Sequence, residues 1–203
     1  MAQKADGAAG RTDRRRELLD VAAKVFAAKG VSHTTVRDIA EAGGILSGSL
    51  YHHFDSKNQM VAEVLEAGLS EGGARDAAII AEASGPVDAM RQLIIGLATW
   101  VGEHPEVARI LANDQQYIKE NADLIDVEIG RQKNRVLWVS VVQRGIDTGV
   151  FSPTIDPEVS VRAMFDGLLG SVRWMPPLGR SEPVEIGSEL ADFFVSGLEG
   201  PLG

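Results

Sequence analysis

Apolar residues recur at every third or fourth position through most of the chain, which is the spacing that places them on one face of an α-helix. Glycines, prolines and capping residues interrupt this pattern and divide the 203 residues into about nine segments. The run at 136–142 is apolar enough for a buried strand, but helix formers flank it and no partner strand is present. We therefore predict an all-α fold of about nine helices.

Capping and breaking residues mark the expected helix ends. Thr12 is placed to cap the first helix, and Lys29 followed by Gly30 ends it. Thr35 begins a capping-box pattern at the second helix, and Ser47 is expected to cap the third. The remaining expected boundaries are an S-x-x-Q box at 56–59, glycines at 72 and 73 that end or fray the fourth helix, breaks at 84–86 and 104–105, a long helix over 121–147, and proline starts at 157 and 183.

Residues 34–57, TTVRDIAEAGGILSGSLYHHFDSK, set two short helical patterns around a glycine turn. Leu50 and Phe54 are spaced to pack inward, which leaves the short residues at 47–49 facing outward. Short side chains at the start of a helix let that helix approach base edges in the major groove of DNA. An ordinary corner between two helices has the same spacing, so the pattern alone leaves both interpretations open.

The residue order in this segment resembles the DNA-binding signature of the TetR family of bacterial transcriptional repressors. The matching features are threonines at 34 and 35, a small-residue turn, the Leu-Tyr-x-His-Phe string at 50–54 and the lysine at 57. The resemblance implies a three-helix head within residues 1–56, a helical effector and dimerisation domain within 57–203, and a palindromic double-stranded DNA operator as partner. The residues expected to contact DNA are Arg11, Arg14, Thr34, Thr35, Arg37, Ser47, Gly48, Ser49, Tyr51, His52, His53 and Lys57.

The net charge of −9 argues at first against a polyanion as partner, but the charge is unevenly distributed. Residues 1–57 hold nine Lys or Arg and seven Asp or Glu, whereas the rest of the chain holds eleven and twenty-two. The arginines at 11 and 14–16 are expected to meet DNA phosphates, although such a cluster is also common on a solvated helix face. Arg37 suits a base edge or a phosphate as well as it suits solvent.

The last two helical patterns carry apolar residues that a single chain would have difficulty covering. From the pattern alone they suit a core and an interface between subunits equally well. In the TetR family the corresponding helices form a four-helix bundle with a second subunit, and a two-fold operator requires a two-fold protein. The resemblance therefore implies a homodimer, with Phe165, Leu168, Val172, Leu190 and Phe193 along its seam.

The resemblance also implies a mostly apolar effector pocket inside the helical domain. Each expected pocket residue can equally be ordinary core or part of a solvated turn. The expected residues are Leu97, Trp100, Asn113, Tyr117, Trp138, Val142, Phe165 and Arg173.

A narrower resemblance concerns the strings at 35–57 and 171–179, which are similar to those of TetR-type repressors of cholesterol ring catabolism in actinobacteria. The effector of such a repressor is a coenzyme A thioester of a steroid ring fragment. The chain differs from that relative at Phe165 and Leu169. We expect a small apolar or acyl-CoA-like effector and a role in steroid or lipid catabolism. The arginines available for its phosphates are Arg109, Arg131, Arg135, Arg162, Arg173 and Arg180.

Other classes of protein are disfavoured. The chain has no cysteine and no G-x-x-x-x-G-K, H-E-x-x-H or G-x-S-x-G motif, so we expect neither an enzyme nor a cofactor. Side chains of His52 and His53 diverge by about 100° on a helix, which disfavours a metal site. Without an apolar leader or a membrane-spanning run, we expect a cytoplasmic protein without membrane contact. The alternative to a ligand-released repressor is an activator or a ligand-independent DNA-binding regulator.

Overall fold

The computed structural model describes residues 6–175 and 182–199, with only the backbone described for residues 6–12. These residues form ten α-helices and two short 3-10 helices, and no strand occurs among them. The helices are α1 (Asp6–Lys29), α2 (Val36–Ala42), α3 (Ser47–Leu50), α4 (Lys57–Glu82), α5 (Pro86–Glu103), α6 (Pro105–Asn113), α7 (Gln115–Glu120), η1 (Ala122–Leu124), α8 (Ile125–Asp147), α9 (Pro157–Gly170), η2 (Ser171–Arg173) and α10 (Pro183–Glu199). The predicted all-α fold is confirmed, and the apolar run at 136–142 lies within α8.

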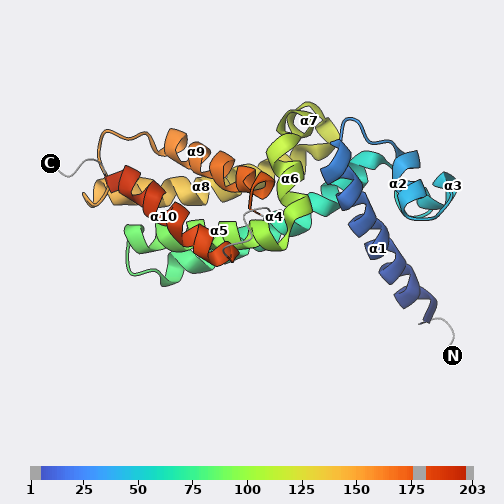
Figure 1. Cartoon of the computed structure of the whole chain (residues 1–203), viewed down its shortest axis with the longest axis horizontal. Helices are drawn as coiled ribbons and strands as arrows, with labels where there is room; N and C mark the ends of the chain where they lie inside the picture. The colour runs from blue at the N-terminus through green and yellow to red at the C-terminus, as the bar shows by residue number, and fades with distance from the viewer. Residues whose placement is uncertain (1–5, 176–181, 200–203) are drawn as a thin grey trace.

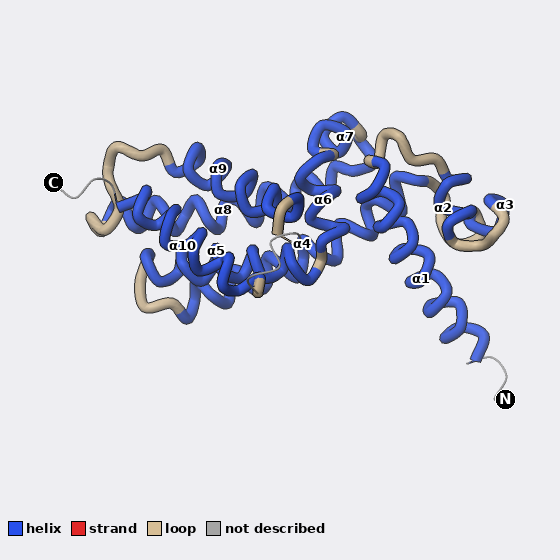
Figure 2. The backbone as a smooth tube through the Cα atoms, viewed as in Figure 1, coloured by secondary structure: helices blue, strands red, loops and turns tan. Residues whose placement is uncertain are grey.

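The molecule is elongated, with α1, α2 and α3 forming a head at one end and the remaining helices forming a bundle (Figure 1). α4 belongs to both parts, because it packs against α1 and continues along α5 and α8. α6 also packs against α1 as well as against α9, so the bundle meets the head through two helices. Short loops join most of the helices (Figure 2). Within the described ranges, none of them combines the length and the apolar character needed to cross a membrane.

The buried residues follow the predicted apolar stripes. Leu50 and Phe54 are buried in the head, and the stripe of α5 from Met90 to Val101 is buried in the bundle. α10 packs against α5 along the side of the bundle, where Ile186 is covered. The hydrophobic effect thus fixes which face of each helix turns inward.

The region 114–125 differs from the sequence prediction. Instead of one helix over 121–147, the chain forms α7 and η1, and α8 begins only at Ile125. The Asn121 side chain donates a hydrogen bond of 2.7 Å to the Tyr117 carbonyl, which satisfies one of the last carbonyls of α7 as that helix ends. This additional short helix brings the number of α-helices to ten.

α4 neither ends nor frays at Gly72 and Gly73, so that prediction was wrong. The helix continues to Glu82, and the predicted break at 84–86 follows it. A Cβ atom on Gly73 would lie 2.6 Å from Oδ1 of Asn134 on α8, and Nδ2 of Asn134 donates to the Leu69 carbonyl at 2.9 Å. Close packing against α8 therefore offsets the low helix propensity of the two glycines.

The predicted caps of the DNA-reading region are partly confirmed. The Thr35 hydroxyl accepts from the Asp38 N–H at 3.2 Å and the Asp38 carboxylate accepts from the Thr35 N–H at 2.8 Å, which is the expected capping box. Ser47 was wrongly expected to cap α3. The N-cap is Leu46, whose side chain makes no capping hydrogen bond, and Ser47 is the first helical residue. α3 is thus one turn long, and a turn over 51–53 follows it.

The caps of α4 and α9 follow the sequence closely. Oγ of Ser56 accepts from the Gln59 N–H at 3.1 Å, while Oε1 of Gln59 accepts from the Asp55 N–H at 2.6 Å rather than from that of Ser56. The Asp156 carboxylate accepts from the Val159 N–H at 3.0 Å, with proline at the next position as expected. Both helices therefore begin where the side chains predict.

Candidate DNA interface and effector cavity

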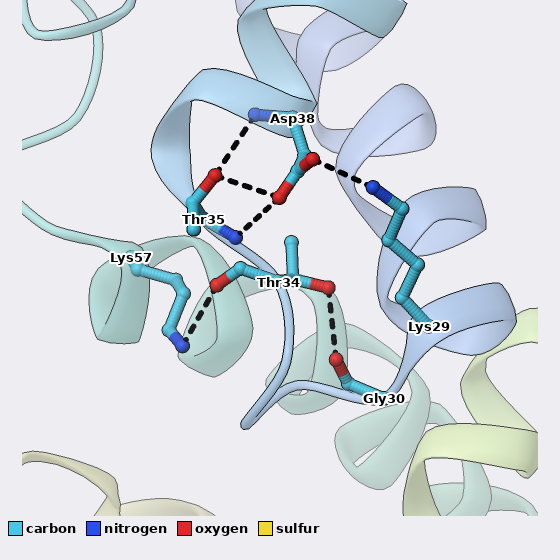
Figure 3. A network of polar contacts seen from close by, with 6 residues as sticks. All are labelled: Lys29, Gly30, Thr34, Thr35, Asp38 and Lys57. Carbon is cyan, nitrogen blue, oxygen red and sulfur yellow. Dashed lines mark hydrogen bonds and ion pairs between the residues drawn. The ribbon is translucent and has the colours of Figure 1, made fainter.

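Polar contacts fix the turn between α1 and α2 (Figure 3). The Thr34 hydroxyl donates to the Gly30 carbonyl at 2.8 Å, and Nζ of Lys57 donates to the carbonyls of Val31 at 2.7 Å and Thr34 at 3.0 Å. Thr34 is only 2% exposed and its hydroxyl is engaged within the chain, so the DNA contact expected from its place at a helix start stays a prediction without support from its side chain. For Lys57, two of three N–H donors are engaged and burial lowers the pKa, so its phosphate contact stays a prediction for the third donor.

An ion pair locks the start of α2 to the end of α1. Nζ of Lys29 lies 2.6 Å from Oδ1 of Asp38, whose other oxygen takes the hydrogen bonds of Thr35 (Figure 3). The hydrogen bond from Lys29, and to a smaller extent the hydrogen bonds from Thr35, hold the pKa of the Asp38 carboxyl well below its usual range. α2, the helix that precedes α3, is thus fixed at its first turn by contacts within the chain.

Most of the predicted DNA contacts are accessible at the tip of the head. Thr35, Arg37, Gly48, Tyr51 and His52 are exposed. The side chains of Ser47, Ser49 and His53 are partly exposed on the same short segment. Their contacts with DNA stay predictions. Among the described residues no group of three or more His, Asp or Glu side chains is arranged to hold a metal.

Arg15 has a structural role that the sequence did not indicate. Its Nη2 donates to Oε1 of Glu63 at 2.6 Å, its Nε donates to the His53 carbonyl at 3.3 Å, and its guanidinium lies 4.5 Å from the centre of the Phe54 ring. Hydrogen bonding to Glu63 raises the pKa of Arg15. The expected phosphate contact was therefore wrong for Arg15, which fastens α1 to α4 and to the end of the reading segment.

The neighbouring arginines differ from Arg15. Arg14 is exposed, pairs with Glu17 at 2.7 Å and donates to the Gly43 carbonyl at 3.2 Å, beside the glycine turn. Arg16 is exposed as well. Arg11 lies where only the backbone is described, so its side chain is outside the described part of the structure. Phosphate contact stays a prediction for these three residues.

A cavity of about 170 Å³ lies between α4, α5, α8 and α9, with α6 and α7 on its head-facing side. Five of its lining residues are cations and three are acids, so the wall is net positive in a chain of net charge −9. The lining residues are Gly68, Leu69, Gly72, Arg75, Asp76, Leu97, Trp100, Leu111, Gln115, Lys119, Glu128, Arg131, Asn134, Arg135, Arg162, Phe165, Asp166 and Leu169. This composition is suited to a ligand with both apolar and anionic parts.

Two polar atoms of the cavity wall are buried without a hydrogen-bond partner: Nε1 of Trp100 and Nε of Arg135. Glu158 is the ion-pair partner of Arg135, but its carboxylate lies 3.7 Å away, beyond hydrogen-bond distance. Burial also lowers the pKa of Arg131, one turn before Arg135 on α8. Unpaired buried donors are rare in folded proteins, because each forfeits the hydrogen bonds it makes with water in the unfolded chain.

The rear wall of the cavity, in contrast, has its polar groups paired. Asp76 is 2% exposed, and its carboxylate accepts from Nη2 of Arg75 at 2.7 Å and from Nε1 of Trp138 at 2.7 Å. The Trp138 ring lies 4.8 Å from that of Phe165. Arg75 and Asp76 were not among the residues expected at this site, because α4 was expected to end or fray at the glycines before them.

The effector residues predicted from the sequence are divided by the structure. Leu97, Trp100 and Phe165 line the cavity. Trp138 and Val142 are buried in the core and are not part of the cavity wall. Tyr117 lies beyond the wall as well, where its hydroxyl donates to Oδ1 of Asn58 at 2.7 Å and its ring packs under Lys57. For Trp138, Val142 and Tyr117 the predicted place in the wall was wrong, because apolar spacing does not distinguish a cavity wall from the core behind it.

A second hollow of about 280 Å³ adjoins the first and shares Gln115, Asp166 and Leu169 with it. Arg173 lines this hollow and donates to Oδ1 of Asn113 at 2.9 Å, so the structure brings these two predicted residues together. Of the arginines considered for an anionic effector, 131, 135 and 162 line the main cavity and 109 lines neither hollow. Arg180 lies outside the described residues.

One buried carboxylate connects the cavity region with the head. Oδ1 of Asp114 accepts from the Val31 N–H at 2.9 Å, and burial raises the pKa of Asp114. The next residue, Gln115, lines the cavity and donates to Oδ1 of Asp166 on α9 at 3.3 Å. Asp114, which holds the turn before α2, is therefore the direct neighbour of a residue in the cavity wall.

The predicted dimer seam lies partly inside the chain. Leu168 and Val172 are 0% and 1% exposed, so these two were wrongly placed in a seam, whereas Phe165 is half-buried and lines the cavity, and its seam contact stays a prediction. Leu190 is partly covered by the core of its own chain. Phe193 is 73% exposed and stays a predicted seam residue.

Small and apolar residues are also exposed on α9. Val159, Ala163 and Gly167 are exposed at a spacing of four residues, which places them on one side of that helix. A Cβ atom on Gly167 would lie 3.2 Å from the ring of Phe194, so α10 approaches α9 there. We call Val159, Ala163, Gly167 and Phe193 the α9/α10 face.

Two family models together match most of the chain. The model for bacterial regulatory proteins of the tetR family matches residues 18–64, and the model for the tetracyclin repressor-like C-terminal domain matches residues 83–198. The chain belongs to the TetR family. It is 34% identical over 194 residues to the HTH-type transcriptional repressor KstR2 of Mycobacterium tuberculosis, covering 95% of this chain and 97% of that protein. The resemblance inferred from residues 34–57 is thus confirmed for the whole molecule.

Solved structures of TetR-type proteins have the same fold. The ketosteroid transcriptional regulator KstR2 of Mycobacterium tuberculosis matches with a TM-score of 0.82 at 34% identity, covering 91% of this chain and 94% of that one. AibR in complex with isovaleryl coenzyme A and operator DNA matches with a TM-score of 0.77 at 21% identity, covering 93% and 100%. The second likeness concerns the fold alone.

Proposed function

We propose that this member of the TetR family is a homodimeric repressor that binds a palindromic operator and releases it when an apolar, anionic metabolite fills the cavity. A coenzyme A thioester from steroid or lipid breakdown is the effector class we infer. KstR2, to which the chain is similar over nearly its full length, is a ketosteroid regulator. AibR holds isovaleryl coenzyme A on the same fold.

DNA binding is supported by the exposed tip of the head. Short side chains at residues 47–49, together with Arg37 and Tyr51 nearby, provide a surface that enters a major groove and meets the flanking phosphates. α2 and α3 lie at one end of the molecule, and most of the acidic remainder of the chain lies in the bundle beyond α1 (Figure 1). The α9/α10 face offers each chain an apolar surface on which a second copy can pack about a two-fold axis.

The observation that carries the effector proposal is the positive cavity wall with its two unpaired donors. An anionic oxygen supplies the acceptor that Trp100 and Arg135 lack, and Leu97 and Phe165 provide apolar contacts for a ring or an acyl chain. Ligand pockets usually measure about 300–1,000 Å³, so a cavity of about 170 Å³ holds such a molecule only if it widens or if the ligand extends into the adjoining hollow of about 280 Å³. We propose that the cavity widens, so that the ligand binds a conformation that differs from the empty one.

Widening of the cavity is transmitted to the head through α7. Displacement of α7 moves Asp114, and with it the hydrogen bond to Val31 that holds the turn before α2. A tenfold loss of operator affinity requires about 1.4 kcal/mol of coupling, so the ligand must bind the released conformation at least tenfold more tightly than the DNA-bound one. A few new hydrogen bonds to charged donors are sufficient for this difference.

The test uses the DNA upstream of the protein's own gene, labelled for fluorescence anisotropy. We expect tight, salt-dependent binding to this duplex over a scrambled one, and release by steroid-derived acyl-CoA thioesters but not by coenzyme A alone. Free acids and simple fatty acyl-CoAs, titrated in parallel, separate the acyl part from the thioester. Equal affinity for both duplexes would refute the repressor, and operator binding that no thioester weakens up to about 1 mM would refute the effector class.

Two arginines of α8 provide a matched pair of variants. Arg135→Gln removes a cation from the cavity wall, whereas Arg144→Gln removes an exposed cation from the same helix outside it. We expect the first to raise the ligand concentration needed for release at least tenfold and to leave operator affinity unchanged. The second should change neither quantity. The same loss of response in both variants would show a general electrostatic effect instead of a binding role.

A further inference from the structure

The most exposed large apolar side chain in the described part of the chain is Leu46, which is 80% exposed. Folding gains little from an apolar group left in water, and single exposed apolar residues are common on protein surfaces, so exposure alone assigns no role to this residue. Its place in the fold does set it apart from other exposed apolar residues, because it lies at the N-cap of the reading helix α3.

A leucine at this position forgoes a stabilising interaction. Ser, Thr, Asp and Asn are preferred at N-caps because their side chains accept a hydrogen bond from the first turn, and Leu46 makes none. The Leu46 carbonyl does accept from the N–H groups of Ser49 at 2.9 Å and Leu50 at 3.3 Å. These backbone hydrogen bonds start α3 whatever the side chain at position 46 is, and the isobutyl group of Leu46 takes no part in capping the helix.

Most of the residues around Leu46 have short side chains or none. Cβ atoms placed on Gly44 and Gly48 would meet nothing within 4 Å, and Ser47 and Ser49 are short. Leu46 thus projects from a surface of small residues, at the outer tip of the head where α3 lies (Figure 1). In the major groove the distinct apolar feature on base edges is the C5-methyl group of thymine, which 5-methylcytosine also carries.

We propose that Leu46 reads a C5-methyl group, that of thymine, at one fixed position in each operator half-site. This proposal rests on the proposed function, since it requires sequence-specific DNA binding. Leu46 contributes specificity through contact of its methyl groups with the base, and the polar residues around it hold the helix at the phosphates. Burying one methyl group is expected to change affinity about fourfold, and about 15-fold when both half-sites are counted.

The first experiment is selection of duplexes from random-sequence DNA with the full chain. The proteins compared are wild type, Leu46→Ala, Leu46→Met and Val136→Ala, the last removing a 59% exposed valine of α8 as a control. We expect wild type, Leu46→Met and Val136→Ala to enrich the same palindrome with a thymine at one position of each half-site. Leu46→Ala should keep the palindrome and lose the preference at that position alone.

The second experiment replaces the selected thymine with deoxyuridine, which lacks only the methyl group. Wild-type affinity should fall about fourfold for one half-site and about 15-fold for both, whereas Leu46→Ala should bind both duplexes equally. A pair of 5-methylcytosine with guanine at the same position, compared with unmethylated cytosine, shows whether the methyl group suffices without thymine. If the methylated pair restores wild-type affinity, Leu46 reads the methyl group of 5-methylcytosine as well. If it does not, Leu46 reads thymine alone.

Leu46→Ser distinguishes reading from a structural role. A serine gains the capping hydrogen bond and loses the methyl contact, so thermal stability should rise or hold while the response to uracil disappears. If Leu46 had a purely structural role, Leu46→Ser would lower both stability and affinity, and replacing thymine with uracil would not change the affinity of the wild type.

The proposal is overturned if wild type is insensitive to uracil at every thymine, or if Leu46→Ala retains the same response. In those cases the palindrome is still selected and the proposed function stands. Selection of no sequence by the wild type would overturn both.

Discussion

The head and the effector domain use their charged side chains differently. In the head, Arg15, Lys29 and Lys57 each have a carboxylate or carbonyl partner in the chain, and the turn before α2 is held without any ligand. In the effector domain, the cavity wall carries more cations than acids and two of its donors have no partner. The difference fits the proposed function: the head is held in one shape by contacts within the chain, while the cavity is proposed to gain its missing hydrogen bonds when an anion enters.

This comparison depends first on which surfaces of the effector domain are core and which are seam. Leu168→Glu places a carboxylate where the side chain is 0% exposed, and we expect unfolding by about 3–5 kcal/mol or loss of soluble protein. Phe193→Glu changes an exposed residue of the α9/α10 face, so the fold should persist while the dimer and operator binding are lost. Circular dichroism and light scattering measure the two effects. If Leu168→Glu gives a folded monomer, Leu168 belongs to the seam between subunits and its assignment to the core is wrong.

The second prediction concerns the packing of α4 on α8, which forms the cavity wall. Gly73→Ala places a Cβ atom 2.6 Å from Oδ1 of Asn134, so we expect a loss of about 1–2 kcal/mol in unfolding free energy. At Gly72 the nearest atom to the new Cβ is 3.7 Å away, so Gly72→Ala should gain about 0.5–1 kcal/mol from helix propensity. Urea unfolding of the two variants checks this. Equal stabilities would mean that the close approach of the helices is unimportant.

The third prediction separates two residues of the head. Tyr51→Phe removes a hydroxyl from an exposed ring, and we expect about 1 kcal/mol weaker binding to all duplexes with unchanged stability. Lys57→Ala should weaken binding and also cost about 1–2 kcal/mol of unfolding free energy, because the Val31 and Thr34 carbonyls lose a donor. Anisotropy and urea unfolding measured on the same samples test this. An unchanged stability of Lys57→Ala would assign that lysine to DNA alone.

The smallest expected effects concern two carboxylates whose pKa shifts are opposite. Lys29 and Thr35 lower the pKa of Asp38 in the fold, so its contribution to stability is present above the unfolded pKa of about 4 and is lost as pH falls. Burial raises the pKa of Asp114, so its contribution is greatest when it is protonated and is lost as pH rises through the raised value.

Asparagine variants make this difference measurable. Relative to wild type, Asp38→Asn should lose stability as pH rises toward about 4 and keep that difference at higher pH, whereas Asp114→Asn should gain stability as pH rises above about 4 through the raised pKa of Asp114. Unfolding free energies at several pH values, each compared with wild type, give the two slopes. Slopes of the same sign would contradict the assigned causes.

Much of the fold was predictable because its signals are local. Periodic apolar stripes, the Thr35 and Asp156 caps and the breaks at 84–86 and 104–105 depend on residues within one or two turns of each other. The head was predictable for a further reason, since its string of mixed residues at 34–57 is specific enough to indicate the family. Leu97, Trp100 and Phe165, expected from the same resemblance to bind an effector, do line the cavity, and effector binding by them stays a prediction.

What the sequence could not decide depends on contacts between residues far apart in the chain. Gly72 and Gly73 indicate a helix end locally, and only Asn134 on α8 makes them a packing site inside a long α4. Arg15 has the same local pattern as Arg14, yet Glu63, 48 residues away, removes it from the DNA-facing set. Sequence alone thus determined most of the helices, the family and the segment expected to read DNA, whereas tertiary structure decided where α4 ends, which charges are paired and which wall lines a cavity. The physical reason is that pairing and burial arise only when distant helices meet, and local spacing carries no record of which partner a side chain will find.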